Sequence, residues 1–496
     1  MPLPFKNHLV PNSRTAIAFA AFMLAGCASL DNSPINVPFE TELGGANLSS
    51  DIFGNEKGSD TLVGLTFSGG GTRAAAFSFG VLKAFGDLNI DTGGGKSFNL
   101  LDRVDFVSGV SGGSVTAAYY GLKGRAALSD FRERFLIKDA EESMNESLVN
   151  PGNIMKLYAG GANDRSNLPA WLDKNLFEGA TFGQLLARKH PSVWINASDI
   201  ANHAPFVFEP NTFRALCSDL AKFPLSEAVA ASAAVPLIFA PVTLEAFPER
   251  CKYEMPPWAK YAQEQPAAPA LLKGYARALA SYRDPDKLKY VRLLDGGLTD
   301  NFGLSGITIA RAAAEAPYAP LTPRQAVTLK RALFVVVNSG RASETDWAKT
   351  KVGPTIGPLI SAVIDTGVDS SVRQGFDAFQ LTISRWQEEL KTWRCKLSMS
   401  EVLKLRGSTA GWKCNDVKFE SGEVAFDQLP DRNERLKKIA TSFVLPVNEV
   451  DFLIESGQMV VQSNATINGF LRSFRGGAGA PSAAPQSMQK ETVVTR

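Results

Sequence analysis

Residues 104–120 read VDFVSGVSGGSVTAAYY, and this stretch does most to decide the fold. Its beginning predicts a short buried strand, and its end, from Ser114 to Tyr120, predicts a helix. The turn between them is a G-x-S-x-G motif with Ser111 at its centre and glycines at 109 and 113. A serine held on so tight a turn needs glycine neighbours, because a side chain there would clash. The free N–H groups at the start of the helix then favour negative charge beside Ser111.

A second strand-turn-helix unit precedes the first one. An apolar run at 62–67 ends in SGGGTR at 68–73, and a helical pattern follows up to Phe85. The turn offers a row of backbone N–H groups that could bind an oxyanion or a phosphate. The row comprises Gly69, Gly70 and Gly71, and the turn continues into Thr72 and Arg73. Ala74 excludes a dinucleotide-binding G-x-G-x-x-G motif, and alanines at 74–76 exclude a P-loop opening at Gly69.

A third motif places a carboxylate at the end of an apolar run. Asp295 follows residues 290–294 and precedes Gly296 and Gly297. In a parallel sheet the carboxyl ends of the strands border the ligand crevice, which would make Asp295 a catalytic candidate. An Asp before two glycines is also a frequent turn former, and the motif alone leaves both interpretations open.

The shortage of histidine limits the catalytic schemes. Histidine occurs only at positions 8, 190 and 203, and the order Ser, acid, His of an α/β-hydrolase triad is impossible with Asp295 as the acid. His190 and His203 stand in segments typical of turns or surface loops. A nucleophilic Ser111 must therefore take its base from a carboxylate.

Taken together in their order, the three motifs resemble those of the patatin-like phospholipase family. Segments 195–199, INASD, and 228–236, AVAASAAVP, are similar to family segments as well. The resemblance covers residues 60–340 and implies a Ser111–Asp295 dyad that cleaves lipid esters without a cofactor or metal. It also implies that the loop Gly69, Gly70, Gly71, Thr72 and Arg73 supplies the oxyanion hole. Arg73 would either contact a lipid phosphate or make a structural ion pair, and we favour the structural role. Ala74, where the family usually has glycine, leaves the fine shape of the loop open.

Further apolar runs at 193–197 and 333–337 alternate with helical stretches, which predicts a parallel sheet covered on both faces. The expected fold is thus α/β, a patatin-like three-layer arrangement with a mostly parallel central sheet, an insertion and a C-terminal extension. The expected domains are a signal peptide at 1–26, a tether at 27–60, a catalytic domain at 61–340 with an insertion at about 245–289 carrying one helix at 271–282, a C-terminal portion at 341–475 packed on that domain, and a disordered tail at 476–496.

The N-terminus has the layout of an export signal. Lys6 and Arg14 precede an apolar run at 16–24, and small residues lead to Cys27. The sequence LAGC at 24–27 resembles the lipobox of bacterial lipoproteins, which implies a lipid-modified Cys27 that anchors the protein to a membrane of the cell envelope. Ala28 after the cysteine favours the outer membrane, by resemblance to the common sorting rule. An ordinary secretory signal is the alternative.

With Cys27 assigned to lipid, four of the five cysteines remain. In an oxidising compartment we expect them to pair by proximity, as Cys217 with Cys251 and Cys395 with Cys414. Four buried free thiols are the alternative. No C-x-x-C spacing occurs, so the sequence predicts no zinc site.

The charge balance excludes one class of partner. Lys and Arg number 52 against 50 Asp and Glu, which gives no basic field for nucleic acid. The expected partners are a lipid ester substrate and a membrane reached through the N-terminal anchor. The same chemistry also fits an acyltransferase or a thioesterase, and the fold alone would fit a non-catalytic lipoprotein scaffold of the outer membrane.

Overall fold

The computed structural model describes residues 31–40, 59–91, 97–144, 161–188, 190–340, 346–349 and 351–475. The predicted signal peptide, Cys27 and the predicted tail lie outside the described residues. Within these ranges the helices are α2 Gly71–Asp87, α3 Gly112–Lys123, α4 Ala127–Phe131, α6 Leu168–Leu172, α7 Phe182–Arg188, α8 Pro210–Ala215, α9 Leu225–Ser232, α10 Pro257–Glu264, α11 Ala270–Ser281, α12 Gly297–Asp300, α13 Ser305–Ala312, α14 Pro323–Thr328, α15 Ile356–Arg394, α16 Met399–Arg406, α17 Pro430–Lys438, α18 Val447–Ser463 and α19 Ala465–Arg475. None of them is long and apolar enough to cross a membrane.

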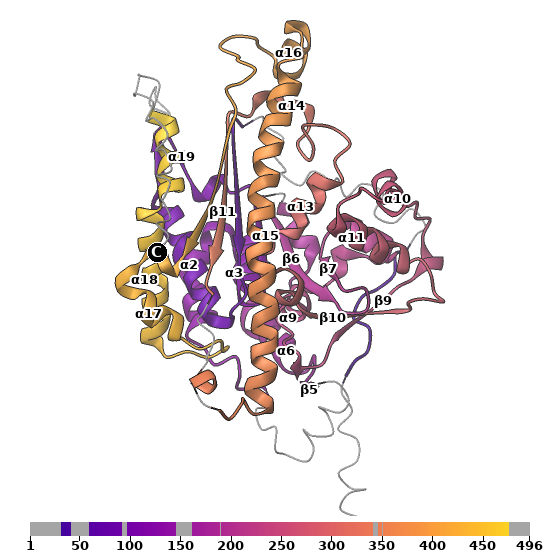
Figure 1. Ribbon diagram of the computed structural model, residues 1–496, viewed down its shortest axis with the longest axis vertical. Helices are drawn as coiled ribbons and strands as arrows, with labels where there is room; N and C mark the ends of the chain where they lie inside the picture. The colour runs from indigo at the N-terminus through magenta and orange to yellow at the C-terminus, as the bar shows by residue number, and fades with distance from the viewer. Residues whose placement is uncertain are drawn as a thin grey trace, which may run out of the picture.

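An eight-stranded sheet forms the middle layer of the described part of the chain (Figure 1). Its strands are β1 Thr61–Phe67, β4 Phe106–Val110, β6 Ser192–Asp199, β7 Ala204–Val207, β9 Val242–Glu245, β10 Tyr290–Asp295, β11 Arg331–Asn338 and β12 Lys418–Ala425. The order is β12-β11-β1-β4-β6-β10-β9, with β7 also paired to β6. From β12 to β6 all neighbours are parallel, whereas β7 and β10 run antiparallel to β6. The predicted α/β class with a mostly parallel central sheet is confirmed.

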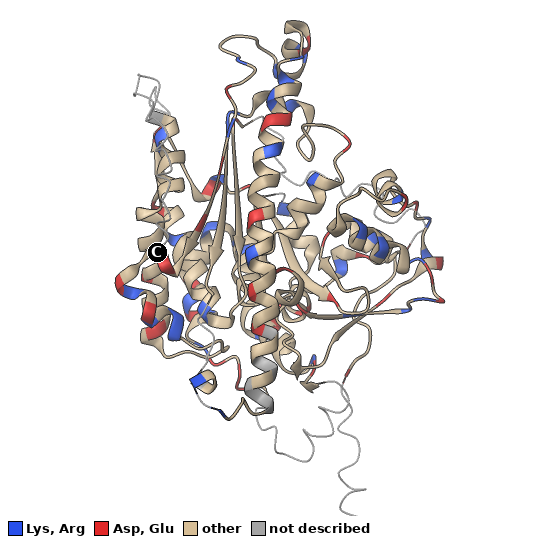
Figure 2. Ribbon diagram, viewed as in Figure 1, with Lys and Arg blue, Asp and Glu red and all other residues tan. Residues whose placement is uncertain are grey.

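Strands β1, β4 and β11 are mostly apolar and buried because both faces of the sheet are covered there. Successive side chains of a strand point to opposite faces. Leu333 and Val335 of β11 therefore join the core cluster that contains α2, α3 and α18, whereas Phe334 joins the cluster that contains α15. Figure 1 shows α15 running along the sheet for most of its length. Figure 2 shows charged residues of both signs mainly on the outer helices and few on the central strands.

The C-terminal portion, predicted to pack on the catalytic domain, continues its sheet. Strand β12 pairs with β11, and α18 packs against α2. The two helices come close because each has a glycine at the contact. A Cβ on Gly80 would lie 2.1 Å from the carbonyl oxygen of Ile454, and a Cβ on Gly457 would lie 2.4 Å from that of Phe77.

Gly80→Ala should therefore destabilise the protein, although alanine usually favours a helix. The added methyl group forces the two backbones apart, and overpacking of this kind typically costs about 1–3 kcal/mol. The matched control is Gly274→Ala in α11, where nothing lies within 4 Å of the added Cβ. We expect that variant to be neutral or stabilised by up to about 1 kcal/mol. Thermal unfolding of both variants checks the difference, and equal melting temperatures would contradict the close contact.

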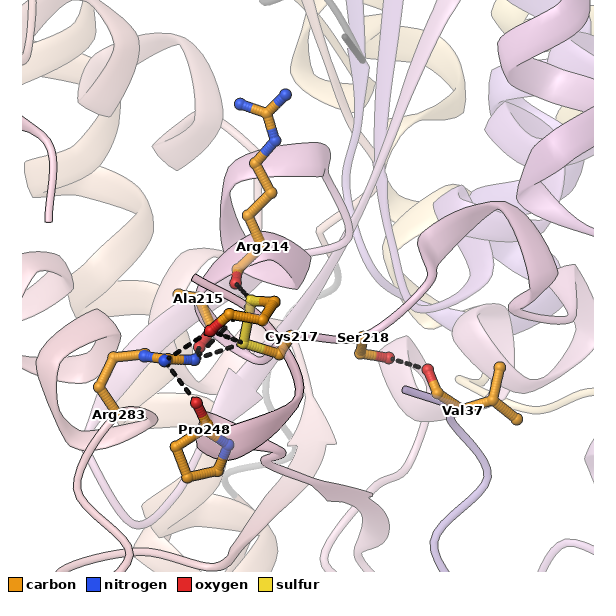
Figure 3. The surroundings of a disulfide bond; sticks show 8 residues. Val37, Arg214, Ala215, Cys217, Ser218, Pro248 and Arg283 are labelled. Carbon is orange, nitrogen blue, oxygen red and sulfur yellow. Dashed lines mark hydrogen bonds between the residues drawn. A yellow bond between two sulfur atoms is a disulfide. The ribbon is translucent and has the colours of Figure 1, made fainter. Parts of the chain in front are cut away.

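The predicted insertion lies between β9 and β10 and holds α10 and α11, the latter close to the helix expected at 271–282. One disulfide, Cys217–Cys251, closes its base with an S–S distance of 2.11 Å, and the other, Cys395–Cys414, has 2.05 Å. These are the two pairs expected from the sequence. Arg283 donates hydrogen bonds to the carbonyl oxygen of Pro248, at 2.6 Å, and to other groups around the first disulfide (Figure 3).

Residues 31–40 differ from the expectation of a free tether, since they lie against the folded body. The N–H of Phe39 donates to the carbonyl oxygen of Cys217, and the Ser218 hydroxyl donates to that of Val37 at 3.0 Å (Figure 3). Asn36 is buried, and its side chain bonds both Ser218 and the backbone of Glu245. The polar composition that suggested a tether is here used for hydrogen bonds to the body.

Candidate active site

Ser111 stands between β4 and α3 in a strained backbone conformation, with φ 50° and ψ −124°. Positive φ is unfavourable for any residue with a Cβ and is kept where the surroundings fix it. The neighbouring glycines are required by close packing. A Cβ on Gly109 would lie 2.6 Å from the carbonyl oxygen of Gly113, and one on Gly112 would lie 1.9 Å from that of Gly71. The predicted turn therefore brings the serine loop directly against the glycine-rich loop.

A chain of hydrogen bonds holds Ser111 in place. Its N–H donates to the hydroxyl oxygen of Ser232 at 2.9 Å, and that hydroxyl donates to the carbonyl oxygen of Asn196 at 2.6 Å. The Asn196 amide in turn donates to the carbonyl oxygen of Gly109 at 2.9 Å. Both supporting residues lie in the segments 195–199 and 228–236, whose resemblance to family segments was noted from the sequence.

Asp295 reaches Ser111 by a route that the parallel-sheet argument did not anticipate. Strand β10 runs antiparallel to β6, so it does not follow the parallel order that the sequence suggested. It overlaps only the last residues of β6 and stops where Asp295 pairs with Ala197, so its carboxyl end still lies level with that of β4. The neighbouring residue, Asn196, pairs with Val110, the residue before the serine. The register of β6 thus brings the two motifs together.

The Asp295 carboxylate is held in an environment that suits a base. The N–H of Gly297 donates to its Oδ1 at 2.8 Å, and the side chain of Ser111 is a second hydrogen-bonding partner. Burial raises the pKa of Asp295 to about 6, although both hydrogen bonds oppose the rise. The Gly296 N–H bonds the carbonyl oxygen of Ser232, at 3.1 Å, so Ser232 ties both halves of the pair to α9.

Fewer N–H groups of the predicted oxyanion loop are available to bind an oxyanion than the sequence suggested. The N–H of Gly69 already donates to Asn301, and the N–H of Thr72 donates to the carbonyl oxygen of Ser442 at 2.8 Å. In the described part of the chain the N–H groups of Gly70 and Gly71 have no hydrogen-bond partner, and both glycines line the cavity beside Ser111. These two N–H groups, at the start of α2, are the ones placed to bind an oxyanion.

Arg73 connects the loop to the C-terminal portion. Its guanidinium donates to the carbonyl oxygens of Ser339, at 3.0 Å, and Ile439, at 2.9 Å, and to the hydroxyl of Thr441. The side chain is buried, with 3% exposed. These contacts support a structural role for the Arg73 side chain.

Ser111 and Asp295 open into a cavity of about 520 Å³. Apolar side chains form much of its wall, namely Met144, Ala162, Val235, Pro236, Ile238, Phe239, Leu298, Val368 and Phe443. A cavity of this volume with an apolar wall is of the kind that accepts an apolar ligand group. Residues from β5 Gly161–Asn163, β8 Leu237–Phe239, α15 and segment 441–443 all border it. The C-terminal portion thus completes a site whose reactive groups lie before residue 300.

No histidine lines this cavity among the described residues, and His190 and His203 are both exposed. Groups of three or more His, Cys, Asp or Glu that could bind a metal are likewise absent from that part of the chain. A base for Ser111 is thus available from Asp295 alone among the cavity residues in contact with it.

Several residues that contribute to the site belong to no sequence motif. Asn301, Ser442 and Glu141 stand outside every motif, yet Asn301 and Ser442 occupy two of the loop N–H groups. The Glu141 carboxylate accepts hydrogen bonds from the N–H of Phe443 and the hydroxyl of Ser442, which fixes the segment at 442–443. Each acts through long-range contacts that leave no local pattern.

The pKa of Asp295 predicts the pH dependence of any reaction that uses it as base. The carboxylate form exists above about pH 6, so kcat/KM should rise with pH through that value and then level. Below it, activity should fall about tenfold per pH unit. Because an imidazole would titrate at about 6.5, the position of the limb does not distinguish the two groups. Its temperature dependence does, since a carboxyl pKa hardly moves on warming and an imidazole pKa falls. A limb that shifts markedly with temperature would contradict Asp295 as the base.

Comparison with known proteins agrees with this geometry. Residues 65–306 match the family model described as patatin-like phospholipase. No curated protein sequence matches the chain. Among solved structures, human GIVD cytosolic phospholipase A2 is similar at 13% identity and a TM-score of 0.39, over 84% of this chain and 60% of that one. VipD from Legionella pneumophila is similar at 12% identity and a TM-score of 0.30, over 84% of this chain and 67% of that one. Residues 65–306 therefore form a patatin-like phospholipase domain.

Proposed function

We propose that the chain is a serine lipid acyl hydrolase in which Ser111 and Asp295 cleave carboxylic ester bonds of lipids or phospholipids. One observation carries the proposal. A serine on a strained turn contacts a partly buried carboxylate, and two glycine N–H groups without a partner among the described residues line the same cavity. Nucleophile, base and oxyanion donors are the three parts that acyl transfer requires.

The reaction begins when the Ser111 oxygen attacks the ester carbonyl carbon and its proton passes to Asp295. The N–H groups of Gly70 and Gly71 stabilise the tetrahedral oxyanion. The intermediate collapses to an acyl-serine, and Asp295 returns the proton to the departing alcohol. Water then attacks the acyl group, giving its proton to Asp295, and the fatty acid leaves as the serine hydroxyl is restored.

The wall of the cavity supports a lipid acyl chain as the group transferred. Apolar surface from Val235, Phe239 and Leu298 would bury methylene groups, each worth about 0.8 kcal/mol when removed from water. A short ester forgoes most of that energy. We therefore expect a preference for long acyl chains over short ones.

The test is product analysis with a panel of lipid esters and thioesters, using the purified protein and Ser111→Ala as the blank. Release of free fatty acid from esters, absent in the variant, supports the proposal. Transfer of the acyl group to an added alcohol in place of release would assign an acyltransferase, and cleavage of thioesters alone would assign a thioesterase. A wild-type protein inactive on the whole panel would favour a non-catalytic scaffold.

We further propose that Cys27 carries a diacylglyceryl group and an acylated amino terminus. These chains hold the protein on a membrane of the bacterial envelope, and Ala28 after the cysteine favours the outer membrane. The sequence LAGC at 24–27 is the support. Multiple acyl chains give stable attachment, whereas a single chain is marginal.

Cells grown with labelled palmitate should therefore yield a labelled protein in the membrane fraction. Cys27→Ser removes the thiol that takes the lipid, so that variant should be unlabelled. The measurement is the label on the purified protein after membrane fractionation, detected by autoradiography or by click chemistry. A wild-type protein that is soluble and unlabelled would return the N-terminus to an ordinary signal peptide.

A further inference from the structure

The docked segment 31–40 fixes where the N-terminal chain leaves the folded body. Its first described residue, Asp31, donates its N–H to the carboxylate of Asp164 at 3.0 Å. The Asp31 carboxylate lies 3.9 Å from the guanidinium of Arg165. Asp164 directly follows β5 Gly161–Asn163. In Figure 1 the indigo segment accordingly ends near β5. The chain therefore departs beside that strand.

Strand β5 belongs to the rim of the active-site cavity. It pairs in parallel with β8 Leu237–Phe239, and the Asn163 amide donates to the carbonyl oxygen of Ile238 at 3.0 Å. Asn163 and Phe239 line the active-site cavity. The same two residues also line a second, smaller cavity, which Asp31 borders. One pair of short strands thus separates the chain exit from the cavity.

The same rim exposes apolar side chains that nothing in the described chain covers. Leu237 and Ile238 on β8 are 46% and 45% exposed. On the first turns of α15, Leu359 and Val363 are 49% and 65% exposed. Asp365 and Val368 on the following turn line the cavity, so these turns of α15 stand at its border too. Figure 1 places β5 and this end of α15 at the same end of the molecule.

Chain length connects this rim to the proposed anchor. Cys27 precedes Asp31 by four residues, so the two Cα atoms can be at most about 14 Å apart. An acyl group on Cys27 enters the bilayer and holds the cysteine at the membrane surface. A tether from 27 to 60 that made no contact with the body would let the body take any orientation. Because residues 31–40 are docked, only the short connection from Cys27 to Asp31 separates the anchor from the body.

We propose that the rim formed by β8 and the first turns of α15 rests on the bilayer that carries the Cys27 anchor, so that the cavity faces the lipids of that same membrane. This inference rests on the proposed lipid modification of Cys27, and it names the substrate pool as the lipids of the anchoring leaflet. Leu237, Ile238 and the α15 residues enter the apolar edge of the bilayer, where their exposed surface is removed from water. A lipid leaving the bilayer then meets Ser111 without crossing water.

The test reads lipid contact and does not depend on hydrolysis. The full-length acylated protein carries Ser111→Ala and one fluorescent label, attached at Leu237→Cys or at the control position Leu381→Cys. Leu381 is 72% exposed on α15. It lies 18 residues beyond Val363 of the rim, which is about 27 Å along the helix axis. The remaining cysteines are paired or acylated, so each protein offers a single free thiol. The label is quenched by phosphatidylcholine vesicles with brominated acyl chains.

We expect the label at 237 to be quenched at least severalfold more than the label at 381. Insertion of a 20-residue Gly-Ser spacer after Ser29, with a span of about 25 Å, should reduce quenching at 237. Equal quenching at the two positions, or quenching unaffected by the spacer, would overturn the proposed orientation. A shielded label at 237 without vesicles, together with a dimer mass in light scattering, would assign the rim to a second copy of the chain instead. Absence of acyl mass on Cys27 would overturn this inference while leaving the esterase proposal intact. Selective quenching at 237, together with a wild-type protein that is inactive on the lipid panel, would support this inference and overturn the esterase proposal.

Discussion

Ser111→Ala should abolish lipid ester hydrolysis in a protein that still folds. The nucleophilic oxygen is lost, so kcat should fall by about four orders of magnitude or more. Folding should survive because the replaced hydroxyl group is small, and because the backbone bond from residue 111 to Ser232 remains. The measurement is kcat on a long-chain ester beside circular dichroism and a melting curve. Unchanged hydrolysis in a folded variant would remove Ser111 from the mechanism.

A comparison with Ser111→Gly tests the strained turn independently of activity. Both variants lack the hydroxyl, but only glycine adopts φ near 50° without strain. Strain of this kind costs about 1–3 kcal/mol, and the extra freedom of glycine in the unfolded chain offsets about 0.4–1 kcal/mol of the gain. We expect Ser111→Gly to be inactive and to melt at a higher temperature than Ser111→Ala. The reverse order of stability would contradict a strained nucleophile.

Asp295→Asn should reduce turnover nearly as far as loss of the serine. The amide keeps the size of the side chain and can still accept from Gly297, but it cannot take the proton of Ser111. Residues that act as a unit lose nearly all activity when either is removed. The double variant with Ser111→Ala should therefore be no slower than either single one. Steady-state kinetics of the three proteins on one substrate provide the measurement.

Two histidine variants serve as matched controls for this prediction. His190→Ala and His203→Ala alter exposed residues that do not line the cavity, so turnover should change little. A folded but inactive His203→Ala beside a nearly active Asp295→Asn would contradict a dyad without histidine.

Much of the fold followed from local patterns. Uninterrupted apolar runs predicted buried strands, and every one of those runs lies in the central sheet. The glycine motifs predicted two tight turns, which the structure brings into contact between Gly71 and Gly112. These features depend on a few neighbouring residues, which is why a single sequence reveals them.

The remaining features depend on contacts between distant segments. The direction of β10 is set by its pairing with β6 and β9, and no pattern within residues 290–295 states it. The carbonyl oxygen of Ser442 accepts a hydrogen bond from the N–H of Thr72, although the two residues are 370 positions apart in the sequence. The polar segment at 31–40 was expected to be free because it lacks periodicity, but it satisfies hydrogen bonds along β9 and the disulfide loop.

The pairing of Ser111 with Asp295 as nucleophile and base is the central claim, and active-site labelling tests it most directly. A fluorophosphonate probe forms a bond to the oxygen of an activated serine and loses fluoride, and mass spectrometry locates the adduct. We expect a single adduct on the peptide that contains Ser111 in the wild-type protein, formed at a rate that rises with pH through about 6, and formation at least 100-fold slower in Asp295→Asn. An adduct on another serine, or labelling of Ser111 at the wild-type rate in Asp295→Asn, would contradict the account.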